Sequence, residues 1–166
     1  NVIDLAKRFG VSSPLPVDAS LSLGTGEVSL IELTAVYASL ANDGTLVLPH
    51  GITRIDNRGG KILYSRKSSG TKPIVSNKTL RGIRDLLATT VSHGTGSKAT
   101  LPSSFQGTYG KTGTSQNFRD AWFIGFSNNL VVGVWLGNDN EDPMKNISGG
   151  GAPALIWRDF MLRTRD

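Results

Sequence analysis

Cysteine is absent from the 166-residue sequence, and histidine occurs only twice, as His50 and His93. Without cysteine the chain has no disulfide framework, no thiolate nucleophile and no cysteine-ligated zinc or iron–sulfur site. Two histidines far apart in the sequence give little material for a metal cluster or for a Ser-His-Asp relay. We therefore interpret both as loop residues and expect neither a metal nor a cofactor.

Long hydrophobic runs are missing as well. The most apolar stretch, residues 121–137, is interrupted by polar residues 127–129 and by glycines, so it does not predict a membrane-spanning helix. No signal-peptide pattern is present. The chain begins with Asn1 rather than methionine, from which we expect a fragment or a processed product.

Acidic residues are fewer than basic ones, since 13 Asp and Glu stand against 18 Lys and Arg, a formal net charge of +5. Such an excess raises the question of nucleic-acid binding, which needs clustered basic residues. Here they are scattered, and the one dense run, residues 61–72, alternates with serine and glycine and holds a single aromatic residue, Tyr64. We interpret this run as a solvated loop and expect no nucleic-acid partner.

The spacing of apolar residues predicts four helices, over residues 1–9, 29–41, 76–91 and 152–163. Ser29 and Glu32 form the pattern of a capping box, and Ser76 is a candidate N-cap. Pro153 is tolerated because it falls in a first turn. Segments rich in serine, proline and glycine predict loops over residues 12–26, 65–73 and 95–110, and residues 149–151 predict a hinge or loop.

Two hairpins are also expected. Residues 52–56 and 61–65 flank a turn-rich tetrad at 57–60, which predicts a small hairpin. Residues 121–126 and 130–136 are rich in aromatic and β-branched side chains and predict an antiparallel hairpin buried largely on both faces. Helices that precede a strand-rich segment, followed by a closing helix, favour an α+β fold with few strands over a βαβ winding. The length is sufficient for one domain with its own core.

Residues 110–114, Gly-Lys-Thr-Gly-Thr, are the most informative stretch. A phosphate-binding P-loop would need glycine at position 105, which is Phe105, and a helix directly afterwards, which the sequence does not predict. The other known use of Lys-Thr-Gly is a serine acyl-transfer site, where it lies on a sheet-edge strand beside a Ser-x-x-Lys nucleophile and a Ser-x-Asn loop. There lysine supplies charge, threonine a short donor, and glycine room for an extended substrate.

A pattern of three residues such as Lys-Thr-Gly occurs by chance in many sequences. The sequence blocks around it therefore decide between the P-loop and the acyl-transfer site. Six of them, residues 23–29, 93–96, 110–114, 120–126, 131–139 and 152–160, resemble in the same order the C-terminal part of the transpeptidase domain of class A, bifunctional penicillin-binding proteins of the 1A/1C type. The resemblance implies a partial penicillin-binding transpeptidase or serine β-lactamase-like fold over residues 1–166, with an antiparallel sheet flanked by helices. It also implies a D,D-transpeptidase parent that cross-links peptidoglycan stem peptides through a serine acyl-enzyme and binds penicillin.

The resemblance assigns roles to four residues. Lys111 would interact with the second-motif serine and polarise the cleft. The hydroxyls of Thr112 and Thr114 would bind the carboxylate of a D-Ala-D-Ala stem peptide or of a β-lactam. The Thr114 backbone N–H would form half of the oxyanion hole, and Gly113 would keep the strand open.

The sequence departs from the family pattern at the nucleophile motif, Ser-x-x-Lys. The only Ser-x-x-Lys match starts at Ser69, where Gly70 and Pro73 argue against the required helix, so we interpret it as a chance match. The two Ser-x-Asn matches, residues 115–117 and 127–129, are interpreted as turns. We expect the serine, its partner loop, a glycosyltransferase domain and a membrane anchor upstream of Asn1. This chain alone would then be inactive, and the parent protein would lie at the extracytoplasmic, periplasmic face of the bacterial inner membrane.

A different class of function stays open at this point, namely a non-catalytic module that binds a muropeptide or a protein partner. The presence of Ser-x-x-Lys and Ser-x-Asn in the upstream reading frame would discriminate against it. A truncated domain would also leave apolar surface and a strand edge uncovered, which predicts self-association.

Overall fold

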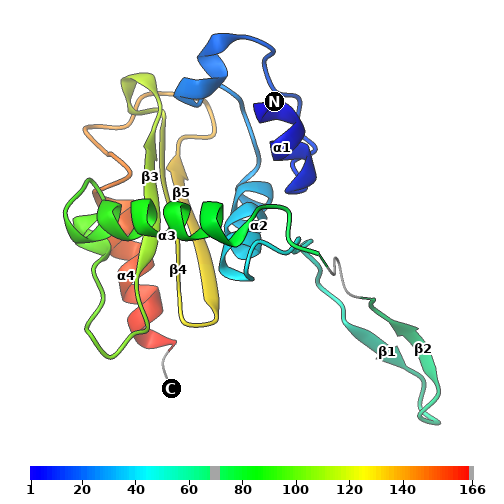
Figure 1. Ribbon diagram of the computed structural model, residues 1–166. Coiled ribbons are helices and arrows are strands. Elements are labelled where there is room, and N and C mark those ends of the chain that lie inside the picture. Colours follow the sequence, from blue (N-terminus) through cyan, green and yellow to red (C-terminus); the bar gives the residue numbers. More distant parts are fainter. Residues whose placement is uncertain (68–71, 165–166) are drawn as a thin grey trace.

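A computed structural model describes residues 1–67 and 72–164 (Figure 1). Within these residues the helices are α1 (Val2–Arg8), α2 (Leu30–Ala41), α3 (Asn77–Ser92) and α4 (Ala152–Arg163). The strands are β1 (Arg54–Asp56), β2 (Ile62–Ser65), β3 (Tyr109–Thr114), β4 (Asp120–Ser127) and β5 (Leu130–Gly137). Short 3-10 helices are η1 (Ala19–Leu23), η2 (Ser97–Ala99) and η3 (Gln116–Phe118). The α+β class and the four predicted helices are confirmed.

The main sheet is antiparallel in the order β3-β4-β5, so that β4 is its central strand. The predicted pairing of the last two strands is confirmed, with Trp122 opposite Trp135. Burial of this hairpin on both faces is confirmed for β4 but is wrong for β5, whose residues are half-buried or exposed. Because β5 is a border strand among the described residues, helices cover its side chains less completely than those of β4.

Two helical layers enclose the sheet (Figure 1). Side chains alternate between the two faces of a strand, so each residue of β4 points toward one of these layers. Phe123 and Trp157 of α4 are fully buried and meet edge to face, with ring centroids 5.2 Å apart. Phe126, on the opposite face, stacks on Tyr109 at 4.8 Å. It lies in a second cluster with residues of α2 and α3, among them Leu40 and Leu87.

The capping box of α2 forms as predicted, and it also fixes a distant loop. Ser29 Oγ accepts from the Glu32 backbone N–H, and the Glu32 carboxylate accepts in return from the Ser29 N–H. The same carboxylate accepts from the hydroxyls and backbone N–H groups of Ser12 and Ser13. These hydrogen bonds hold the pKa of Glu32 well below its usual range, and the bond from the Ser12 hydroxyl has the largest effect.

The segment predicted as a loop at residues 12–26 contains the 3-10 turn η1, so that prediction is wrong in part. The turn begins at Asp18, whose carboxylate accepts the Ser20 backbone N–H at 2.8 Å, and it ends at Gly24 with φ +82°. Such a side-chain cap is a local signal that composition alone does not reveal.

The small predicted hairpin is confirmed as β1 and β2, which extend away from the sheet (Figure 1). Asn57 closes its turn, since its side-chain oxygen accepts the backbone N–H groups of Gly59 and Lys61 at 2.9 Å each. Every residue of both strands is exposed, including Ile55 and Leu63. The hairpin therefore adds nothing to either buried cluster.

Candidate functional site

The Lys-Thr-Gly-Thr residues are the last four of β3, which pairs with β4 and forms one border of the sheet. Lys111 lies opposite Ile124, and Gly113 lies opposite Trp122. The expected position on a sheet-edge strand is confirmed. A P-loop is excluded, because residues 110–114 are extended and the helix that follows, η3, is a single 3-10 turn.

The two glycines of β3 serve different purposes. A Cβ at Gly110 would lie 2.5 Å from the Phe123 ring, so the buried aromatic core requires glycine there. A Cβ at Gly113 would meet the Trp122 side chain at 3.3 Å, a contact that a small shift could relieve. Packing against β4 therefore does not require Gly113, which fits the expectation that its missing side chain keeps the strand open.

Lys111 places its ammonium at the exposed strand edge. Its Nζ donates to the Thr112 carbonyl oxygen at 2.8 Å. None of the ion pairs among residues 1–67 and 72–164 involves Lys111. The charge is therefore not neutralised by a carboxylate within the described chain and can act on an anionic group.

The two threonines each receive a polar contact from outside the strand. Thr112 Oγ1 lies 2.7 Å from the hydroxyl of Thr95, in the turn that follows α3. Thr114 Oγ1 accepts the backbone N–H of Gly149 at 3.0 Å. Sequence reasoning included Thr95 in a resembling block but missed both contacts, because they join segments that are distant along the chain.

Gly149 and Gly150 bring the segment before α4 against β3 and Thr95. A Cβ at Gly149 would overlap the carbonyl oxygens of Trp122 and Gly113, and a Cβ at Gly150 would overlap the Thr95 carbonyl oxygen. Gly149 is buried. Of the two predicted alternatives for residues 149–151, a hinge or a loop, the structure shows the loop, which packs closely against its neighbours.

The two Ser-x-Asn matches lie at turns between strands. Ser115 Oγ accepts the Asp120 N–H at 2.7 Å between β3 and β4, and Asn117 has φ 59°. Ser127 donates to the Gly107 carbonyl oxygen, and Asn128 accepts the Gln106 N–H at 2.8 Å. Both Ser-x-Asn matches are thus turns, as predicted. The Ser-x-x-Lys match lies outside the described residues, since these exclude its Ser69.

No group of three or more potential metal ligands occurs among residues 1–67 and 72–164. His93 is the C-cap residue that follows α3, and His50 lies in the segment before β1. In this same part of the chain, every helix is too short or too polar to cross a bilayer.

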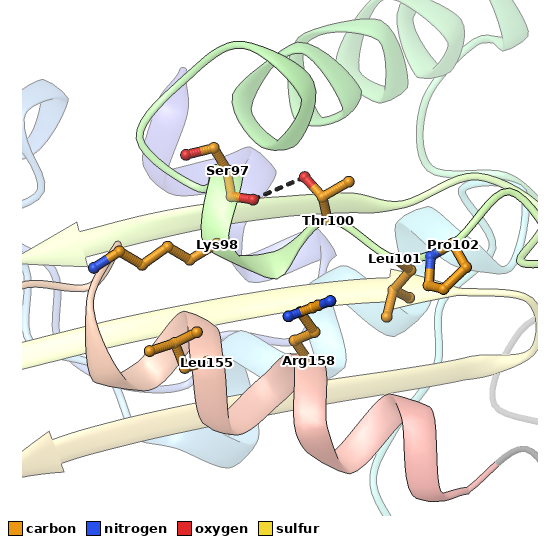
Figure 2. Close-up of a pocket in the computed structure, with 7 residues that line it drawn as sticks. All are labelled: Ser97, Lys98, Thr100, Leu101, Pro102, Leu155 and Arg158. Carbon is orange, nitrogen blue, oxygen red and sulfur yellow. Dashed lines mark hydrogen bonds between the residues drawn. The ribbon is translucent and has the colours of Figure 1, made fainter.

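The cavity in Figure 2 does not include the Lys-Thr-Gly-Thr residues. It has a volume of about 510 Å³ and lies between η2 and α4, where Lys98, Leu101, Leu155 and Arg158 line it. The candidate site in this chain is therefore the open edge of β3 rather than an enclosed pocket.

Comparisons with known proteins match this architecture and motif. The family model of the penicillin-binding protein transpeptidase domain matches residues 6–161. Penicillin-binding protein 1A of Aquifex aeolicus is 35% identical over 96% of this chain. The solved PonA1 protein from Mycobacterium tuberculosis, in complex with penicillin V, is 23% identical over 96% of this chain with a TM-score of 0.83. Penicillin-binding protein 1A from Haemophilus influenzae gives 24% identity over 96% and a TM-score of 0.77.

The chain covers only part of each of these proteins. It spans 22% of the Aquifex relative, 48% of the solved PonA1 chain and 30% of the solved Haemophilus chain. At these identities the two solved structures establish the fold, and the family match rests on the sequence.

Proposed function

The chain belongs to the penicillin-binding protein transpeptidase domain family, and from this premise we propose that residues 1–166 form the C-terminal portion of a peptidoglycan D,D-transpeptidase domain. In this proposal β3 is the wall of the cleft on which the donor stem peptide, ending in D-Ala-D-Ala, or a β-lactam binds. The supporting observation is the unneutralised Lys111 beside two threonine hydroxyls on a border strand.

The proposed reaction proceeds through a serine ester. The serine oxygen attacks the carbonyl carbon of the D-Ala-D-Ala amide, the C–N bond breaks, and terminal D-Ala leaves as an amine that has taken up the serine proton. An acceptor amine then attacks the ester, forms the cross-linking amide, and returns a proton to the released serine oxygen. A β-lactam enters the first step by opening of its ring amide.

In this scheme Lys111 interacts with the second-motif serine and polarises the cleft. The hydroxyls of Thr112 and Thr114 donate hydrogen bonds to the ligand carboxylate. The Thr114 N–H stabilises the oxyanion, and the loss of one such donor typically costs about 2.7–4 kcal/mol of transition-state stabilisation. Gly113 leaves room for the ligand backbone beside the strand.

We place the nucleophilic serine, the Ser-x-Asn loop, a glycosyltransferase domain and a membrane anchor in parts of the protein beyond these 166 residues, with the cleft on the periplasmic side of the inner membrane. The much greater length of the similar proteins supports this placement. The resulting expectation is that the 166-residue chain has no acylation activity by itself.

The test is covalent labelling of the full-length protein by a fluorescent penicillin. Lys111→Ala should slow labelling at least 100-fold. It would remove the charge-assisted interactions of Lys111 with the second-motif serine and with the anionic ligand, each of which contributes about 1.5–3 kcal/mol. Lys61→Ala, an exposed lysine before β2, is the matched control and should label normally.

Near-normal labelling of the Lys111 variant would remove Lys111 from the active site. A wild-type full-length protein that takes no label would favour the non-catalytic binding module instead. A labelled band from the 166-residue chain that survives denaturation would place the nucleophile inside this chain.

A further inference from the structure

Both threonine hydroxyls of the proposed ligand site receive their contacts from glycine-rich turns. Thr95 follows Gly94 after α3, and Gly149 precedes α4. The contacts are Thr95 Oγ1 to Thr112 Oγ1 at 2.7 Å and Gly149 N–H to Thr114 Oγ1 at 3.0 Å. Two elements that carry none of the motif thus converge on its two hydroxyls.

A threonine hydroxyl has one proton to donate and two lone pairs that can accept. A backbone N–H can only donate, so Thr114 accepts from Gly149 and retains its proton. The hydroxyls of Thr112 and Thr114 have no further hydrogen bond among residues 1–67 and 72–164. The protein therefore supplies a partner for an oxygen lone pair at Thr114 and leaves the proton free for an anionic ligand.

The hydroxyl pair Thr95 and Thr112 could orient either way in the free protein. We propose that Thr95 is a positioning residue, which donates to Thr112 Oγ1 and thereby directs the Thr112 proton to the ligand carboxylate. This inference rests on the proposed function of Thr112. A hydroxyl that accepts a hydrogen bond becomes a better donor, so the chain from Thr95 through Thr112 to the carboxylate is cooperative.

Backbone packing holds Thr95 in the position that this role requires. The Gly96 N–H donates to the Thr90 carbonyl oxygen at 3.0 Å and fixes the turn onto the end of α3. On the other side, Gly150 approaches so closely that a Cβ there would overlap the Thr95 carbonyl oxygen. The hydroxyl itself belongs to an exposed residue, so it supports no buried core and its loss should not unfold the protein.

The experiment compares Thr95→Val with Thr95→Ser in the full-length protein and measures the second-order rate constant of acylation by penicillin V. Valine keeps the shape of threonine without the hydroxyl, and serine keeps the hydroxyl. We expect Thr95→Val to acylate about tenfold more slowly, which corresponds to about 1.4 kcal/mol. Thr95→Ser should restore a rate within about twofold of wild type, about 0.4 kcal/mol.

Two further measurements separate positioning from a structural effect. The methyl ester of penicillin V lacks the anionic carboxylate. With this ester, Thr95→Val and wild type should be acylated at the same rate. In a double-mutant cycle, Thr95→Val should add nothing to Thr112→Val, because Thr95 acts only through Thr112. Thermal unfolding of each variant checks that the fold is retained.

Loss of acylation by Thr95→Val with both the acid and the ester, or full additivity with Thr112→Val, would overturn the positioning role. So would a wild-type rate for Thr95→Val in a protein that Lys111→Ala inactivates. A wild-type full-length protein that takes no label would instead refute the proposed function, and this outcome distinguishes the two claims.

Discussion

The hairpin of β1 and β2 exposes every one of its strand residues, whereas β4, in the middle of the three-stranded sheet, is almost wholly buried. Both regions contain antiparallel pairs with tight turns and apolar side chains. They differ in what covers them, because α4 packs on one face of the sheet while α2 and α3 pack on the other. Backbone pairing is therefore common to both regions, and side-chain burial distinguishes them.

This difference bears on where the proposed ligand site lies. A two-stranded hairpin alone is marginally stable in water, so it could not hold donors at fixed positions. The Lys-Thr-Gly-Thr residues instead lie on β3, which β4 fixes on one side and the turns at Thr95 and Gly149 support from outside the strand. The strand β3 thus has one open edge and is held in place by β4 and by these two turns.

The largest expected effect comes from truncation of the buried aromatic pair of Phe123 and Trp157. Phe123→Ala removes the fully buried partner of Trp157 and leaves a cavity, which should lower the opening free energy of β4 by about 3–5 kcal/mol. Hydrogen exchange of β4 peptides in the full-length protein measures it. Equal exchange in wild type and variant would contradict the burial account.

The next effect tests whether the loop at Gly149 supports β3. Gly149→Ala would push the loop away from Trp122 and Gly113, and we expect acylation by penicillin to fall about 10-fold or more, equivalent to about 1.4 kcal/mol. Gly82→Ala is the matched control, because a Cβ at that exposed position of α3 meets nothing within 4 Å. It should stabilise α3 by up to about 1 kcal/mol without slowing acylation. Similar acylation rates for both alanine variants would contradict a supporting role of the Gly149 loop.

A smaller effect, with a defined pH dependence, follows from Glu32. Its pKa is lowered on folding, so its contribution is present above the ordinary glutamate pKa and is lost as the pH falls through the folded value. Glu32→Gln should destabilise α2 by roughly 1 kcal/mol at pH 7. The difference from wild type should shrink as the pH decreases below about 4.5. Urea unfolding across this pH range measures it, and a difference that grows at low pH would have the wrong sign.

The smallest effect is expected at the hairpin. Ile55→Ala removes an exposed side chain and should change the unfolding free energy by less than about 0.5 kcal/mol. Acylation should be unaffected. A loss comparable to that of Phe123→Ala would show that the hairpin is covered by a part of the protein beyond these residues.

Local signals predicted the helices well. The ends of α2 and α3 follow from Ser29, Glu32 and Ser76, whose side chains bond to neighbouring backbone groups. The strand β3 is different, because its two glycines are poor strand formers and its extended shape depends on pairing with β4. Its position at the sheet edge was therefore expected only from the motif and its family resemblance.

Contacts between residues that are distant in the sequence could not be predicted from the sequence. Nothing near Thr95 or Gly149 indicates that either lies against a threonine of β3, since the contacts depend on how α3 and α4 pack on the sheet. The half-exposed state of β5 is likewise a property of three-dimensional cover rather than of residue pattern. The pattern of residues 130–136 specified a strand but not its surroundings.

The central claim is that the free edge of β3 receives the ligand while the exposed hairpin does not. Hydrogen–deuterium exchange of the full-length protein, before and after acylation by penicillin V, tests it most directly. We predict slower exchange in peptides covering residues 109–114 and unchanged exchange at residues 54–65. Unchanged exchange at β3, or equal protection of the hairpin, would contradict the account.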